Sequence, residues 1–164
     1  MSDQQKETLI EWLNDAYAME NSLVETLKRH SKQAEDHPEV QSKIEEHLEQ
    51  TKEHAELVKA CVESLGGSTS AVKKGMGEIG GMISGLGNAA SEDVLVKNAI
   101  ADFAAEHMEI ASYNAIKTAA KQLGEDRVVK ICDQILEQEQ EMADWLEENM
   151  PSAVREFVEE KANA

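Results

Sequence analysis

The sequence predicts an all-α protein that folds as a single domain over residues 1–164. Ala, Glu, Leu, Lys and Gln recur throughout, aromatic residues make up 4% of the chain, and only two prolines are present. The recurring residues lose little conformational entropy in a helix. Apolar side chains also recur at three- and four-residue steps, which is the period of a helix with one buried face. The chain is long enough to bury a sizeable core without disulfides.

Four long helices follow from these apolar stripes and from the residues that interrupt them. The predicted helices cover about residues 6–32, 39–65, 91–123 and 125–149. Pro38 suits the first turn of the second helix, and Gly66–Gly67 ends it. Ser91 is the expected N-cap of the third helix, and Gly124 its C-terminal stop.

One connection is much longer than the others. Residues 66–90 hold eight of the nine glycines and a short apolar pattern, so we expect a long crossover with one weak helix. Pro151 is expected to begin a separate short helix over about 151–160. Two antiparallel helix pairs joined by one long crossover are typical of ferritin-like four-helix bundles.

The charge of the chain limits its partners. Asp and Glu number 33 against 16 Lys and Arg, which gives a net charge of −17. This field opposes binding to nucleic acid and to anionic membrane surfaces. The polar start MSDQQKETLIEW does not resemble a secretory leader, and no stretch reaches the roughly 20 apolar residues that span a bilayer. We therefore expect a cytoplasmic protein.

Two motifs are expected to carry no chemistry. Cys61 and Cys132 lie on separate predicted helices without a CxxC spacing, so they are interpreted as small buried apolar residues. Residues 75–80 match GxGxxG, but no strand precedes them, and the surrounding stretch is simply rich in glycine. Nucleotide binding is not expected there.

A set of polar residues falls where the helical period predicts the interior. Its members are Glu20, His47, His54, Glu106, Glu109 and Glu139. Each alone is explained by a hydrogen-bonded core histidine or by a glutamate at the edge of an apolar stripe. Together they place four carboxyl groups inside with no inward Lys or Arg, and each buried unpaired ion costs several kcal/mol.

Metal ions would balance this charge economically. Two divalent cations match four carboxylates, and oxygen and imidazole ligands suit iron or manganese in a helical bundle. The usual Glu-x-x-His repeat is absent, because the chain reads Thr51-Lys-Glu-His54 and Glu139-Gln-Glu-Met142. Tyr113 shares the Glu109 face, where it is a packed core tyrosine or a hydrogen-bonding or redox neighbour of the metals.

Several segments resemble the bacterial YciE and YciF group of stress-associated ferritin-like proteins, with YciE the closer of the two. The segments are Trp12-Leu-Asn-Asp-Ala-Tyr-Ala-Met-Glu20, Glu46-His-Leu-Glu-Gln-Thr-Lys52, Glu106-His-Met-Glu-Ile-Ala-Ser-Tyr113 and Leu136-Glu-Gln-Glu-Gln-Glu-Met-Ala-Asp-Trp-Leu146. The resemblance covers nearly the whole chain. It implies a rubrerythrin-like fold, a homodimer, a role in stress and a di-iron or related centre.

The family pattern also implies which residues face the metal. Its metal-facing positions are matched by Glu20, His47, Glu106, Glu109 and Glu139. Gln50 and Gln138 stand where the pattern leads us to expect glutamates, and an amide oxygen is a neutral, weaker ligand. Two outcomes remain open: a four-carboxylate site supported by His47 and His54, or a site that has decayed.

Three functions are consistent with these features. The first is a di-metal protein, an enzyme in this case, that acts on a small oxidant, either peroxide or dioxygen. The second is a non-catalytic helical stress or scaffold protein with a degenerate metal site. The third, iron storage, ranks last because nothing in the sequence supplies the cage interfaces that storage requires.

Overall fold

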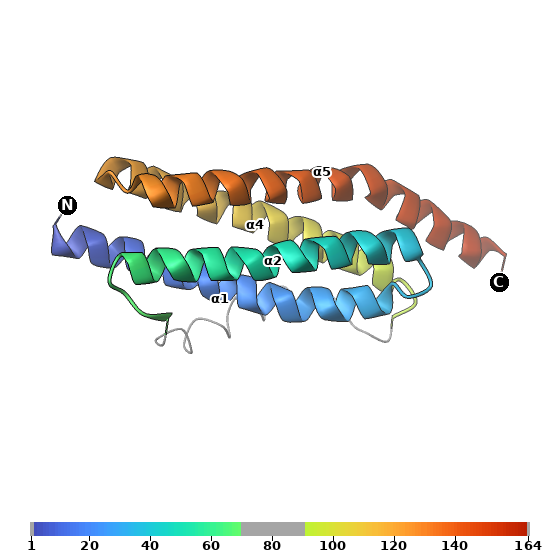
Figure 1. Ribbon diagram of the computed structural model, residues 1–164. Helices are drawn as coiled ribbons and strands as arrows, with labels where there is room; N and C mark the ends of the chain where they lie inside the picture. Colours follow the sequence, from blue (N-terminus) through green and yellow to red (C-terminus); the bar gives the residue numbers. More distant parts are fainter. Residues whose placement is uncertain (1, 70–90, 164) are drawn as a thin grey trace.

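The computed structural model describes residues 2–69 and 91–163, which form a four-helix bundle without strands (Figure 1). The helices are α1 (Asp3–Gln33), α2 (Pro38–Ser64), α4 (Val94–Leu123) and α5 (Asp126–Ala162). The predicted all-α class and all four long helices are therefore confirmed. Among the described residues, no helix is long and apolar enough to cross a membrane.

The helices form two antiparallel pairs. Short links join α1 to α2 and α4 to α5, and α1 also packs on α4 while α2 packs on α5. Figure 1 shows that α2 ends at one end of the bundle and α4 begins at the opposite end. The connection between them therefore joins opposite ends, as a long crossover must. The weak helix and the GxGxxG motif at 75–80 lie outside the described residues.

Local signals explain most helix ends. Ser2 and Gln5 form a reciprocal capping box, which starts α1 earlier than residue 6. Pro38 occupies the first turn of α2, as predicted. The third helix begins at Val94 rather than at Ser91, because the intervening residues form a turn in which the Val94 N–H donates to the Ser91 carbonyl. Gly124 ends α4 with φ 76°, a conformation that favours glycine.

The prediction of a separate C-terminal helix at 151–160 is wrong. Helix α5 continues from Asp126 to Ala162 with Pro151 inside it. A proline removes one backbone donor and bends a helix. Here both Pro151 and Glu147, whose carbonyl loses that donor, are exposed, so the break is tolerated at the surface. Figure 1 shows the red end of α5 angled away from the line of the bundle.

Two apolar clusters form the core, and buried polar groups lie between them in the middle of the bundle. The larger apolar cluster joins all four helices and includes Leu9, Leu13, Val62, Ile116 and Ile135. A smaller cluster, with Leu27 and Ile44, lies toward the end where α1 meets α2. On α2, the buried residues between these clusters include His47, Thr51 and His54.

Candidate metal centre

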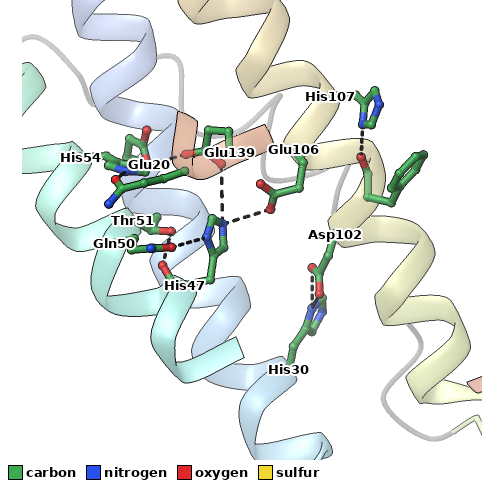
Figure 2. Close-up of polar contacts among 12 residues, drawn as sticks. Glu20, His30, His47, Gln50, Thr51, His54, Asp102, Glu106, His107 and Glu139 are labelled. Atoms are coloured by element: carbon green, nitrogen blue, oxygen red, sulfur yellow. Dashed lines mark hydrogen bonds and ion pairs between the residues drawn. The ribbon is translucent and has the colours of Figure 1, made fainter. Parts of the chain in front are cut away.

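The six polar residues predicted to face inward do so, and we call them the Glu/His cluster. They are Glu20 on α1, His47 and His54 on α2, Glu106 and Glu109 on α4, and Glu139 on α5. Every one is at most 2% exposed. The helical period brings them together because each lies on the same face as its helix's apolar stripe. Figure 2 shows how five of them converge from the four helices.

One half of the Glu/His cluster surrounds His47. The Nε2 atom of His47 lies 3.1 Å from Oε1 of Glu106 and 3.7 Å from Oε2 of Glu139. Ligand atoms of His47, Glu106, Glu109 and Glu139 all lie within 4.8 Å of one another. Three carboxyl groups and one imidazole therefore surround a single position.

The other half surrounds His54. The Nδ1 atom of His54 lies 2.8 Å from Oε1 of Glu139 and 3.8 Å from Oε2 of Glu20. Ligand atoms of these three residues also lie within 4.8 Å of one another. Glu139 belongs to both halves and turns a different oxygen toward each histidine, so it lies between two adjacent positions.

Most of the carboxyl oxygens in this interior have no hydrogen-bond donor. The unpartnered atoms are Oε2 of Glu20, Oε2 of Glu106, and both oxygens of Glu109 and of Glu139. The approach of His54 to Glu139 is short, but its geometry is not that of a hydrogen bond. Among the described residues, no Lys or Arg pairs with the cluster. Buried acceptors without partners are costly, and a bound cation satisfies several at once.

Burial favours the protonated forms of three of these carboxyl groups, those of Glu20, Glu106 and Glu109. It raises the pKa of Glu20 to about 8, with His54 partly opposing the shift and the charge of Glu139 adding to it. Burial also raises the pKa values of Glu106 and Glu109 well above the usual range, and neighbouring carboxyl groups raise them further. Without metal, burial therefore favours the neutral forms of Glu20, Glu106 and Glu109.

The two histidines and Glu139 behave differently. Burial lowers the pKa of His47, so its ring is neutral and its Nε2 can act as a ligand. Burial alone would lower the pKa of His54, but Glu139 and Glu20 outweigh it and raise the value overall. The same pairing lowers the pKa of Glu139 against the effect of its burial. Without metal, the opposite shifts of His54 and Glu139 favour an imidazolium–carboxylate pair between them.

Gln50 and Gln138 occupy the far sides of the two imidazole rings. The Oε1 atom of Gln50 lies 3.2 Å from Nδ1 of His47, and Oε1 of Gln138 lies 2.7 Å from Nε2 of His54. Each amide oxygen can accept the ring N–H, which directs the other nitrogen toward the carboxyl groups. This arrangement gives both glutamines an orienting role that the sequence did not reveal.

Tyr113 is fully buried and its hydroxyl donates a hydrogen bond to Oε1 of Glu20. The bond fixes one oxygen of Glu20 and leaves the other, Oε2, on the side of His54. Burial raises the pKa of Tyr113 well above its usual value, so the phenol stays protonated. The predicted proximity of Tyr113 to the cluster is therefore confirmed.

Sequence reasoning missed a second buried polar pair. Nδ1 of His30 lies 2.8 Å and 3.1 Å from the two carboxyl oxygens of Asp102, and both side chains are buried. Asp102 lies one helical turn before Glu106 on the same face of α4, a spacing that could have identified it. Cys61 and Cys132 are free and buried, as expected, and burial raises their pKa values to about 11 and about 12.

Comparison with known proteins identifies a family and similar structures for this chain. The family described as "Domain of unknown function (DUF892)" matches residues 4–159. A crystal structure of a protein from Xanthomonas campestris pv. campestris is 36% identical, with a TM-score of 0.82, covering 97% of this chain and 99% of that one.

Two more distant structures share the architecture. The E. coli stress protein YciF is 24% identical with a TM-score of 0.74, covering 94% of this chain and 99% of that one. The bacterioferritin-related protein from Bacteroides fragilis, described as a dodecameric thioferritin, is 18% identical with a TM-score of 0.69, covering 96% and 90%. These likenesses confirm the predicted ferritin-like bundle.

Proposed function

The chain belongs to the DUF892 family, and from this premise we propose that it is a stress-associated ferritin-like protein whose Glu/His cluster binds two divalent metal ions. Family membership and the YciF-like fold confirm the resemblance to the YciE and YciF group. The observation that carries the metal proposal is the set of unpartnered carboxyl oxygens around two histidine nitrogens in a closed interior.

Each half of the cluster supplies the ligands for one ion. His47, Glu106 and Glu109 would hold the first ion, and Glu20 and His54 would hold the second. Glu139 would contribute one oxygen to each, because its two oxygens already face different histidines. Oxygen and imidazole donors without thiolate favour iron or manganese over softer metals.

We further propose that the centre reacts with peroxide or dioxygen. A pair of redox-active ions would supply the electrons for reducing such an oxidant. The chain's own residues would exclude bulk solvent, since the whole cluster is buried. Tyr113 would keep a proton next to Glu20, at the hydroxyl that already donates to Oε1. We also propose that the protein is a homodimer and acts in the cytoplasm.

Metal analysis tests the proposal. The protein is purified without chelator and titrated with Mn²⁺ or, under anaerobic conditions, with Fe²⁺. We expect about two ions per chain and a rise in melting temperature, because a ligand that binds only the native state stabilises it. Less than about a tenth of an ion per chain, with no stabilisation, favours instead the scaffold protein with a degenerate site.

A pair of variants separates specific binding from general acidity. Glu109→Gln removes one buried ligand charge at nearly constant volume and should lower both the stoichiometry and the stabilisation by metal. Glu147→Gln makes the same change at an exposed position on α5 and should leave both unchanged. Equal behaviour of the two variants would contradict a site at the cluster.

A further inference from the structure

A groove at one end of the bundle carries a strongly acidic lining. It has a volume of about 780 Å³ and lies among the α1–α2 link, the start of α4 and the last turns of α5. Its acidic residues are Asp36, Glu39, Glu92, Asp93, Glu156 and Glu160. We call it the end groove. A cleft lined by one sign of charge raises the local concentration of ions of the opposite sign.

A buried amide lies directly behind this groove. Gln33 lines the end groove, and its Oε1 accepts a hydrogen bond of 2.9 Å from Nδ2 of Asn98. Asn98 is only 4% exposed, and its own Oδ1 has no hydrogen-bond partner. Next to Gln33, Asn98 therefore offers a buried oxygen acceptor without a hydrogen-bond partner.

The next polar groups on α4 continue inward from Asn98. Asp102 follows after one turn and Glu106 after another, which is a step of about 6 Å each time along the helix. Figure 2 shows Asp102 on the same helix as Glu106 and on the side away from Glu139, with His30 of α1 facing it. Burial chiefly raises the pKa of Glu106, and the charge of Asp102 adds to that shift, so the two are within electrostatic range.

Outside the Glu/His cluster, the buried polar residues of the described chain are concentrated toward the end groove, whereas Oδ1 of Asn14 is a buried polar atom in the other half. From the Glu/His cluster toward the end groove, the buried polar residues are Thr26, His30, Ser31, Asn98 and Asp102. From the cluster toward the opposite end, the fully buried side chains of the described residues belong to the large apolar cluster, in which Tyr113 is the member that contacts Glu20. In the described part of the chain, the succession of buried oxygen groups Asn98, Asp102 and Glu106 runs along α4 from the end groove to the cluster.

We propose that this line of oxygen ligands is the path by which divalent cations reach the Glu/His cluster. The inference rests on the proposed metal-binding function and adds a route to it. The end groove gathers cations, and Asn98 and Asp102 replace hydration oxygens in turn before Glu106 receives the ion. His30 is a positioning residue, because its hydrogen bonds orient the Asp102 carboxyl group.

Uptake kinetics test the path. The metal-free protein is mixed with Mn²⁺, and loss of the free-ion electron paramagnetic resonance signal is followed with time. Asn98→Leu replaces the amide with an apolar group at similar volume, and Asp102→Asn removes the charge at nearly constant shape. We expect each variant to load at least ten-fold more slowly than wild type and to reach the same final stoichiometry.

Two further variants control for folding and for general charge effects. Asn98→Ser keeps an oxygen on the path and should load faster than Asn98→Leu. Asp15→Asn removes one charge beside a different pocket, of about 210 Å³ between α1 and α4, and should load as wild type does. Wild-type rates for both Asn98→Leu and Asp102→Asn would overturn the path while leaving metal binding intact. Failure of the wild type to bind Mn²⁺ would overturn both proposals.

Discussion

His54 and Glu139 meet across the bundle, with Nδ1 of His54 lying 2.8 Å from Oε1 of Glu139. The other oxygen of Glu139 lies 3.7 Å from Nε2 of His47. This single carboxyl group thus joins the two halves of the Glu/His cluster. Because burial alone would neutralise both partners, the raised pKa of His54 and the lowered pKa of Glu139 show that each charge depends on the other.

The metal-free protein should lose stability as pH rises. The pKa of Glu20 is raised from 4.5 to about 8, so the folded state binds its proton more tightly than the unfolded state does. The stabilisation is complete below about 4.5 and is lost as pH rises through about 8. The raised pKa values of Glu106, Glu109 and His54 act in the same direction, whereas the lowered pKa of His47 opposes it. The lowered pKa of Glu139 affects stability only below about 4.5.

Thermal unfolding in the presence of chelator measures this effect. The melting temperature should fall between pH 5 and pH 8.5, and Glu20→Gln, which cannot ionise, should fall less steeply. The same slope in wild type and Glu20→Gln would show that surface repulsion, rather than the buried acids, controls the pH dependence.

Metal binding should release protons. The raised pKa values of Glu20, Glu106 and Glu109 favour their protonated forms, and an ion can use their oxygens fully only after deprotonation. Affinity for Mn²⁺ should therefore weaken as pH is lowered from 8 to 6. Calorimetry in buffers of different ionisation enthalpy counts the protons directly. Binding heats that do not depend on the buffer would contradict protonated ligands in the metal-free state.

Gln138 should support metal binding without being a ligand. Its Oε1 lies 2.7 Å from Nε2 of His54, so Gln138→Leu frees the ring to rotate and removes an acceptor. Loss of such a supporting group costs about 10- to 100-fold in metal affinity. Gln140→Leu, at an exposed position on the same helix, is the matched control and should bind Mn²⁺ as wild type does. Wild-type affinity for Mn²⁺ in Gln138→Leu would contradict an orienting role for Gln138.

The hydroxyl of Tyr113 should stabilise the fold through Glu20. Tyr113→Phe leaves Oε1 of Glu20 buried without a donor, which costs about 1–3 kcal/mol. Urea unfolding at pH 7 in chelator measures this loss. Tyr17→Phe changes a half-buried tyrosine of α1 and should have a smaller effect. Equal free energies of unfolding for wild type and Tyr113→Phe would show that the hydrogen bond contributes nothing.

The sequence predicts that the residues of the Glu/His cluster face the interior, but it does not predict which of them pair with one another. Glu20, Glu109 and Glu139 lie at helical spacing from apolar neighbours, so periodicity alone places them inside. Pairing His30 with Asp102 requires the register of α1 against α4, which a single helix pattern does not contain. The continuation of α5 through Pro151 also depends on the tertiary structure. The helix can lose one backbone hydrogen bond there because that turn is exposed, and a helix pattern alone does not show this exposure.

A crystal structure of the Mn²⁺-loaded protein, with anomalous scattering collected at the manganese edge, tests the central claim most directly. Two adjacent peaks are expected, one contacting Nε2 of His47 and Oε2 of Glu139, and the other contacting Nδ1 of His54 and Oε1 of Glu139. An interior without anomalous peaks, at a Mn²⁺ concentration that occupies surface carboxylates, would contradict a metal centre in this bundle.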